Sequence, residues 1–318
     1  MDLLLSAAFV LCWSSGFIGA KLGAGSASAA TILMWRFLPL VVALAAVGIA
    51  RGGAAWRGLT GREAGRQVLI GVLSQSGYLA TVYYAIQLGV SSGTTALIDG
   101  VQPLVAGALA GPLLRQRVAP AQWLGLVLGV TGVLVVTTAD AASGTAEAWW
   151  AYLVPFLGML SLVAATFVER RRPAPVGASV ALTVHCGTSA VLFTALAACT
   201  GGMTPPADTR FWAAVALLVV PATFGGYGLY WLILRRSGVT EVNTLMFLMA
   251  PVTAVWGAVM FGEPLGPRSL LGLAITLAAV VVVHRGDRGR DGTDGTGEDG
   301  GSRGGRRADE VPATVSTG

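Results

Sequence analysis

The chain has 318 residues, of which 54% are hydrophobic and 12% are charged. Soluble domains carry about twice that share of charged residues, so lipid is the predicted solvent for most of the chain. The formal net charge is +5, but the basic residues lie in small clusters between apolar runs, a pattern that argues against a nucleic-acid partner.

Ten apolar runs are predicted to be transmembrane helices, because each approaches the length of about 17 to 25 residues that a bilayer core requires. In chain order they are residues 3–22, 29–50, 67–88, 92–114, 121–138, 148–168, 176–199, 211–234, 239–261 and 269–284. The first run resembles the core of a signal peptide, but no basic segment precedes it, so a membrane helix is favoured. Residues 285–318 are poor in apolar side chains and are predicted to form a disordered cytoplasmic tail.

The basic residues between these runs indicate the orientation of the chain. One set of alternate connections holds Arg51, Arg57, Arg62, Arg66, Arg115, Arg117, Arg170, Arg171, Arg172, Arg235 and Arg236, and the other holds Lys21, Arg210 and Arg268. Basic residues are retained on the cytoplasmic side, so the larger set and both termini are predicted to face the cytoplasm. The predicted location is the cytoplasmic membrane.

The chain also repeats itself. Gly77-Tyr78 recurs 149 positions later as Gly226-Tyr227, and Pro103 recurs 148 positions later as Pro251. Residues 1–138 and 148–284 are therefore predicted to be two related five-helix repeats. Because five is odd, the repeats enter the membrane in opposite directions, an arrangement that in many transporters places the substrate site between them. The predicted fold is an all-α integral membrane protein of ten helices in two inverted repeats.

Three segments carry a resemblance to a known family: Cys12 to Lys21 (CWSSGFIGAK), Trp35-Arg36-Phe37, and Phe261 to Leu265 (FGEPL). Together with the two proline segments, they make the chain similar to the drug/metabolite transporter superfamily, in its EamA-like ten-helix branch. The first repeat departs from the family pattern, because Leu114-Arg115-Gln116-Arg117 replaces the expected Gly-Glu step. The resemblance implies export or exchange of small metabolites, amino acids or drugs, driven by an ion gradient.

Two ionisable residues are predicted deep inside membrane helices, where a charge is costly unless it faces a cavity or a partner. Arg36 and Asp99 each lie seven residues from the outer end of their predicted helices, which corresponds to roughly 10 Å of depth. We therefore expect them to form an ion pair. The pair either lines a central cavity or only locks two helices together.

Other polar side chains are candidates for substrate binding or ion coupling. Tyr78 and Tyr227, with Gln75, lie too deep for an aromatic belt and are predicted to line the cavity or to pack. His185 is either a proton relay or a satisfied packing residue. Asn243 is predicted near a cytoplasmic mouth.

Two further residues are predicted at the membrane surface. Lys21 is expected to extend toward the lipid headgroups or to meet substrate. Glu263, near a helix end, is expected to be solvated.

The pattern favours a secondary active transporter that uses alternating access, with a proton or sodium ion as the coupling ion. The alternatives are an intramembrane enzyme, for which no HExxH or GxSxG motif is found, and a channel or structural membrane protein. Cys12, Cys186 and Cys199 lie apart in apolar runs, so no metal or cofactor is predicted. The sequence leaves open a monomer or a homodimer.

Overall fold

The computed structural model describes residues 3–50, 56, 59–114, 120–144, 146, 148–171, 176–237 and 239–294, and these ranges contain helices and turns but no strand. The elements are α1 (Leu3–Ala24), α2 (Ala29–Ala50), α3 (Gly61–Gly71), η2 (Val72–Gly77), α4 (Tyr78–Gln87), α5 (Ser92–Gly100), α6 (Gln102–Leu114), α7 (Pro120–Ala142), η3 (Trp149–Tyr152), α8 (Leu153–Arg171), α9 (Ala178–Cys199), α10 (Thr209–Leu217), η4 (Leu218–Gly225), α11 (Gly226–Ser237), α12 (Val239–Phe247), α13 (Met249–Phe261) and α14 (Pro267–Asp294).

Eight helical segments in the described ranges are long and apolar enough to cross a membrane. They are Leu3–Ala24, Ala29–Ala50, Gly61–Gln87, Pro120–Ala142, Trp149–Arg171, Ala178–Cys199, Thr209–Ser237 and Thr244–Phe261. Each coincides with one of the ten predicted runs. The protein is therefore an all-helical, multi-pass membrane protein.

The two other predicted runs look different in the structure. The run at 92–114 is divided into α5 and α6, and the last run is the shorter apolar stretch Pro267–Val283 of α14. α14 continues as a helix to Asp294, whereas the sequence predicts a disordered tail from residue 285. Residues 295–318 of that tail lie outside the described part. Ten crossings therefore stay a prediction.

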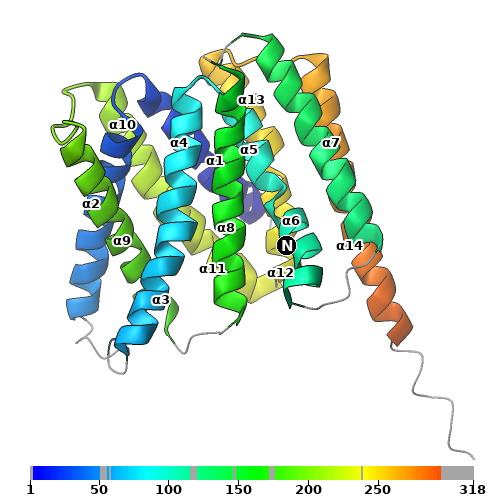
Figure 1. Ribbon diagram of the computed structural model, residues 1–318, viewed down its shortest axis with the longest axis horizontal. Coiled ribbons are helices and arrows are strands. Elements are labelled where there is room, and N and C mark those ends of the chain that lie inside the picture. Colours follow the sequence, from blue (N-terminus) through cyan, green and yellow to red (C-terminus); the bar gives the residue numbers. More distant parts are fainter. Residues whose placement is uncertain are drawn as a thin grey trace, which may run out of the picture.

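The helices form one bundle (Figure 1). In that view α3, α6 and α12 lie toward the lower end, and α10 lies toward the upper end. α1 packs against η4, α10, α11 and α13, so the first helix of the chain lies among helices of the second half. α7 and α14 form a close pair at one side, where Gly132 and Gly272 face each other and let the two backbones approach.

Two long helices contain a π-helical segment at matching places in the two halves. η2 joins α3 to α4, and η4, which begins 146 positions later, joins α10 to α11. A π segment adds a residue to the turn and is common at functional sites. Pro221 lies inside η4 and removes one backbone donor there.

Two other helices are broken, again at matching places. The α5/α6 break is at Val101 and the α12/α13 break is at Leu248, 147 positions later. The nearby prolines explain both breaks, because Pro103 and Pro251 have no N–H to donate to the carbonyls of Asp99 and Phe247. Asp99 therefore lies in the last turn before a helix break.

The loop before α2 and the first turn of α2 are tied to the loop before α10. The Ser26 hydroxyl donates a hydrogen bond of 2.5 Å to Asp208, and the Thr31 hydroxyl donates one of 2.8 Å to the Gly202 carbonyl. The hydrogen bond from Ser26 lowers the pKa of the Asp208 carboxyl, which also accepts from the Arg210 backbone at the start of α10. These bonds join the two halves at one end of the bundle.

Candidate functional site

Arg36 is buried in the middle of α2, with 8% of its surface exposed. Its Nη1 donates to the Tyr83 hydroxyl at 2.7 Å, and its Nη2 donates to the Thr223 hydroxyl at 3.3 Å. The guanidinium also lies over the Phe37 ring, 5.6 Å from the centroid. Since Tyr83 is in α4 and Thr223 is in η4, Arg36 links the first half of the chain to the second.

The predicted ion pair between Arg36 and Asp99 is wrong. Within 4.0 Å, Lys21 pairs with Glu263 and Arg66 pairs with Glu63, but Arg36 does not pair with Asp99. The reason is that Tyr83 and Thr223 hold the guanidinium, whereas the Asp99 carboxylate accepts a hydrogen bond of 2.8 Å from the Tyr78 hydroxyl. Equal depth on two helices does not make two side chains face each other.

Three atoms of this region are buried without a hydrogen-bond partner. They are Arg36 Nε, which is a donor, and Gln75 Oε1 and Asp99 Oδ1, which are acceptors. Buried polar atoms in folded proteins are nearly always paired. Unpaired atoms on three separate elements, α2, η2 and α5, make this region the candidate site.

The Gln75 side chain lies beside Tyr227 of α11 and Cys186 of α9. Arg36 lies within electrostatic range of Tyr227 and Cys186, so we treat these groups as one region. Trp13 of α1 packs next to this region, because the centroid of its ring lies 5.6 Å from that of the Tyr227 ring. We call the whole group the polar cluster: Arg36, Gln75, Tyr78, Tyr83, Asp99, Cys186, Thr223 and Tyr227.

The polar cluster contains five of the seven predicted site residues, namely Arg36, Gln75, Tyr78, Asp99 and Tyr227. His185 lies elsewhere: its Nε2 is 2.9 Å from Oε1 of Gln67 in α3, and Gly71 lies against its backbone. Asn243 is in α12, and its side chain lies outside the described part of the chain.

Tyr83, Cys186 and Thr223 were not among the predicted site residues. The aromatic spacing offered one signal, because Tyr83 lies on the same helix as Tyr78. Cys186 and Thr223 offered none, since small polar residues in membrane helices usually bond to their own backbone. Thr223 does so as well, through a hydrogen bond of 2.8 Å to the Leu218 carbonyl.

A second buried group, the Glu263 cluster, consists of Lys21, Ser91, Ser92, Asp140 and Glu263. The Glu263 carboxylate accepts from the Ser92 backbone at 2.9 Å and from the Ser92 hydroxyl at 2.6 Å, and it lies 3.4 Å from the Lys21 ammonium. Asp140, which is 2% exposed, accepts from the Ser91 backbone at 3.1 Å. Two carboxylates thus compensate the positive N-terminal end of α5.

This geometry corrects two predictions. Glu263 is not solvated, because only 7% of its side chain is exposed. Lys21 pairs with Glu263 and does not simply extend to the headgroups, although 23% of its side chain is exposed. Gly262 explains the burial of Glu263. Its φ of 67° ends α13 in a left-handed turn that leads the next residue back over the helix.

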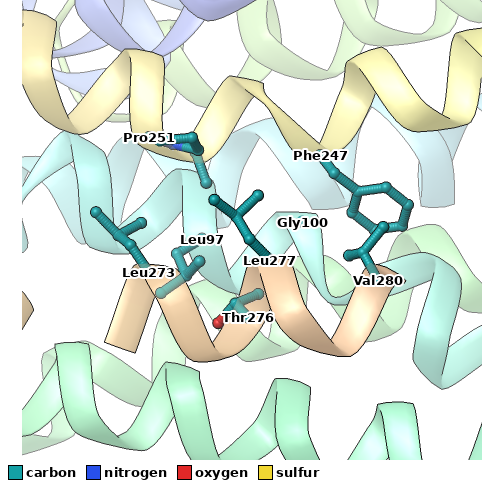
Figure 2. A pocket seen from close by; sticks show the side chains of 9 residues that line it. Leu97, Gly100, Phe247, Pro251, Leu273, Thr276, Leu277 and Val280 are labelled. Carbon is teal, nitrogen blue, oxygen red and sulfur yellow. The ribbon is translucent and has the colours of Figure 1, made fainter. Parts of the chain in front are cut away.

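A pocket lies beside both helix breaks (Figure 2). Its walls come from α5, from the region of the α12/α13 break and from α14: Leu97, Gly100, Phe247, Ala250, Pro251, Leu273, Thr276, Leu277 and Val280. The Thr276 hydroxyl donates to the Gly272 carbonyl of its own helix, so the walls offer little polar recognition. The pocket therefore differs in chemistry from the polar cluster.

A bundle of apolar helices that buries polar groups from both of its halves is the architecture of a membrane transporter. The comparison with protein families identifies the family of transporters. The chain belongs to the EamA-like transporter family, whose model matches residues 2–138 and again residues 149–285. The resemblance found in the sequence to the drug/metabolite transporter superfamily is thereby confirmed.

Curated proteins give the same class. A probable terminal-alkyne amino-acid exporter of Streptantibioticus cattleyicolor is 24% identical over 283 residues, which are 88% of this chain and 92% of that protein. An uncharacterized transporter of Synechocystis sp. is 23% identical over 61% of this chain and 63% of its own length. These names are those of transporters, not of enzymes.

A solved crystal structure shares the fold. It has a TM-score of 0.60 and 21% sequence identity, and the match covers 88% of this chain and 95% of the other.

Proposed function

We propose that this protein is a secondary active exporter of small metabolites in the cytoplasmic membrane and that it works by alternating access. The polar cluster carries the proposal, because it joins Arg36 and Gln75 of the first half to Thr223 and Tyr227 of the second. Polar side chains inside membrane helices are costly and usually mark a substrate or ion pathway. The relative named as an amino-acid exporter makes amino acids the first candidates, ahead of other metabolites and drugs.

The proposal includes ten crossings in two inverted halves, with both termini in the cytoplasm. Support comes from the matching π segments at Val72 and Leu218 and from the matching breaks at Val101 and Leu248. Inverted halves share one site between them, and rocking of the halves opens that site to either side in turn. The broken helices and π segments are the places where such a motion can bend the chain.

We further propose that an ion gradient drives export, with a proton or sodium ion as the coupling ion. The buried Asp99 carboxylate is the group that fits this role in the polar cluster, because its Oδ1 has no partner. No observation on the described helices favours the two alternatives, an intramembrane enzyme and a channel.

Transport by the purified full-length protein tests this function. We expect liposomes with an imposed pH or sodium gradient to move one or more members of a panel of amino acids and other metabolites. Substrate-dependent ion flux, absent from protein-free liposomes, would identify both the substrate and the coupling ion. Folded protein that moves no panel member under either gradient would contradict the proposal.

Cysteine labelling tests the topology. Arg62 and Arg235 are both exposed in the structure. We expect the single variants Arg62→Cys and Arg235→Cys to react with a membrane-impermeant maleimide only from the cytoplasmic side. A cysteine at Arg210, also exposed, should react only from the outer side. The protein without added cysteines is the control for reaction at Cys199, which is exposed as well. Labelling of the first two positions from opposite sides would exclude inverted five-helix halves.

A further inference from the structure

Arg36 is a buried cation to which the described residues offer no anion within ion-pair distance. Its described partners are the neutral hydroxyls of Tyr83 and Thr223, and its Nε is unpaired. A guanidinium cannot lose its proton in a protein, so it cannot escape the cost of burial by becoming neutral. The Phe37 ring offsets only part of that cost. A carboxylate, which accepts two parallel hydrogen bonds from a guanidinium, is the natural missing partner.

Asp99 presents the opposite charge in the same cluster. One of its oxygens accepts from the Tyr78 hydroxyl, and the other is buried and unpaired. Gln75 Oε1 is a second unpaired acceptor of the polar cluster. Two acceptors without donors suit an ammonium group, which carries three donors.

The surroundings of these groups are aromatic. Tyr78 and Tyr227 belong to the cluster, Trp13 packs on Tyr227, and Phe37 lies under the guanidinium. Such walls suit a ligand whose remaining body is apolar, with few charges beyond the two that the cluster can pair.

We propose that the transported ligand is a zwitterion, an amino acid with an apolar side chain, whose carboxylate binds Arg36 and whose ammonium group binds Asp99. This inference rests on the proposed transport function and names its substrate class. A zwitterion pairs both buried charges, whereas an organic anion leaves Asp99 unpaired and an organic cation leaves Arg36 unpaired. The site therefore rejects both kinds of singly charged compound.

Binding of two matched sets of compounds to the purified full-length protein tests the inference. The first set is norleucine, hexanoate, which lacks the amine, and pentylamine, which lacks the carboxylate; the second is phenylalanine, 3-phenylpropionate and phenethylamine. We expect at least one amino acid to bind, and its two singly charged partners to bind at least about tenfold more weakly, since a site built for a polar group rejects analogues that lack it. The measurement is the ligand-dependent shift in thermal unfolding, repeated by calorimetry.

Two variants test which residue binds which charged group of the ligand. Arg36→Gln should weaken binding of the amino acid but not of the amine, and Asp99→Asn should weaken binding of the amino acid but not of the acid. If Arg36→Gln does not fold, Arg36→Lys, which keeps the positive charge but not the guanidinium, takes its place in the comparison. Glu169→Gln, at an exposed position at the end of α8, is the matched control and should leave all affinities unchanged.

Equal affinity for an amino acid and either singly charged partner would overturn the inference, as would failure of every compound in both sets to bind. Transport in liposomes separates this failure from failure of the proposed function. If the protein moves a panel compound that lacks one of the two charges, it is an exporter whose site is not a zwitterion site. If it moves nothing, the function itself is contradicted.

Discussion

Replacing Asp99 by asparagine is expected to reduce transport by at least about thirtyfold. Asp99 is the proposed partner of the ligand's ammonium group, and removing one member of a buried charge pair costs about 2 kcal/mol or more. The amide has nearly the shape of the carboxylate, and its oxygen can still accept from the Tyr78 hydroxyl, which lies 2.8 Å from Asp99 Oδ2. What the substitution removes is the negative charge beside the unpaired Oδ1. The measurement is the initial rate of substrate flux in liposomes at equal amounts of monodisperse protein.

The matched control is Tyr78→Phe, which keeps the charge at Asp99 and removes its hydrogen-bond donor. We expect this variant to retain more activity than Asp99→Asn, because the carboxylate remains available to an ion or a ligand. If Asp99→Asn transports at the normal rate, Asp99 has no part in transport. If the variant no longer folds while Tyr78→Phe does, the carboxylate has a structural role instead.

The sequence predicts membrane spans well because lipid imposes a narrow physical requirement on them. Eight of the ten predicted runs coincide with helices long enough to cross. The same requirement made Gln75, Tyr78 and Tyr227 stand out, since polar and amphipathic side chains are rare at that depth. Pro103 and Pro251 lack the donor that a helix needs, which explains why the predicted runs 92–114 and 239–261 are each divided into two helices.

Side-chain partners were harder to predict, since position along a helix gives depth but not the identity of the neighbouring helix. Arg36 and Asp99 share a depth, yet Tyr83 of α4 and Thr223 of η4 reach the guanidinium. Thr223 lies 187 positions away in the sequence, and no pattern in a single sequence connects the two residues. The π segment that carries Thr223 shifts this residue relative to its place in a regular helix, so helical spacing does not predict which way it faces.

Glu263 shows the same limit at a helix end. The sequence places it in a short connection, where most acidic residues are solvated. Its burial follows from the left-handed turn at Gly262, which leads the chain back over α13 and brings the carboxylate to the N-terminus of α5. Glycine indicates that such a turn is allowed, but not what the next residue will meet.

That burial leads to the second large effect, which concerns stability. Glu263→Ala is expected to lower the free energy of unfolding by about 2–4 kcal/mol, because it leaves a buried donor pair and a partly buried cation without their acceptor. The Ser92 N–H and hydroxyl lose bonds of 2.9 and 2.6 Å, and these groups have little water to replace the carboxylate. Lys21 adds less to the loss, because 23% of its side chain reaches solvent.

Thermal unfolding of the purified protein in detergent measures this effect, and Glu263→Gln separates its causes. The glutamine keeps an oxygen for Ser92 and also removes the repulsion between Glu263 and Asp140, so its unfolding midpoint should lie between those of the alanine variant and the unmodified protein. Glu169→Ala, at an exposed position, should change the stability by less than about 0.5 kcal/mol. If Glu263→Ala unfolds at the same temperature as Glu169→Ala, the carboxylate does not hold the start of α5 to α1 and α13.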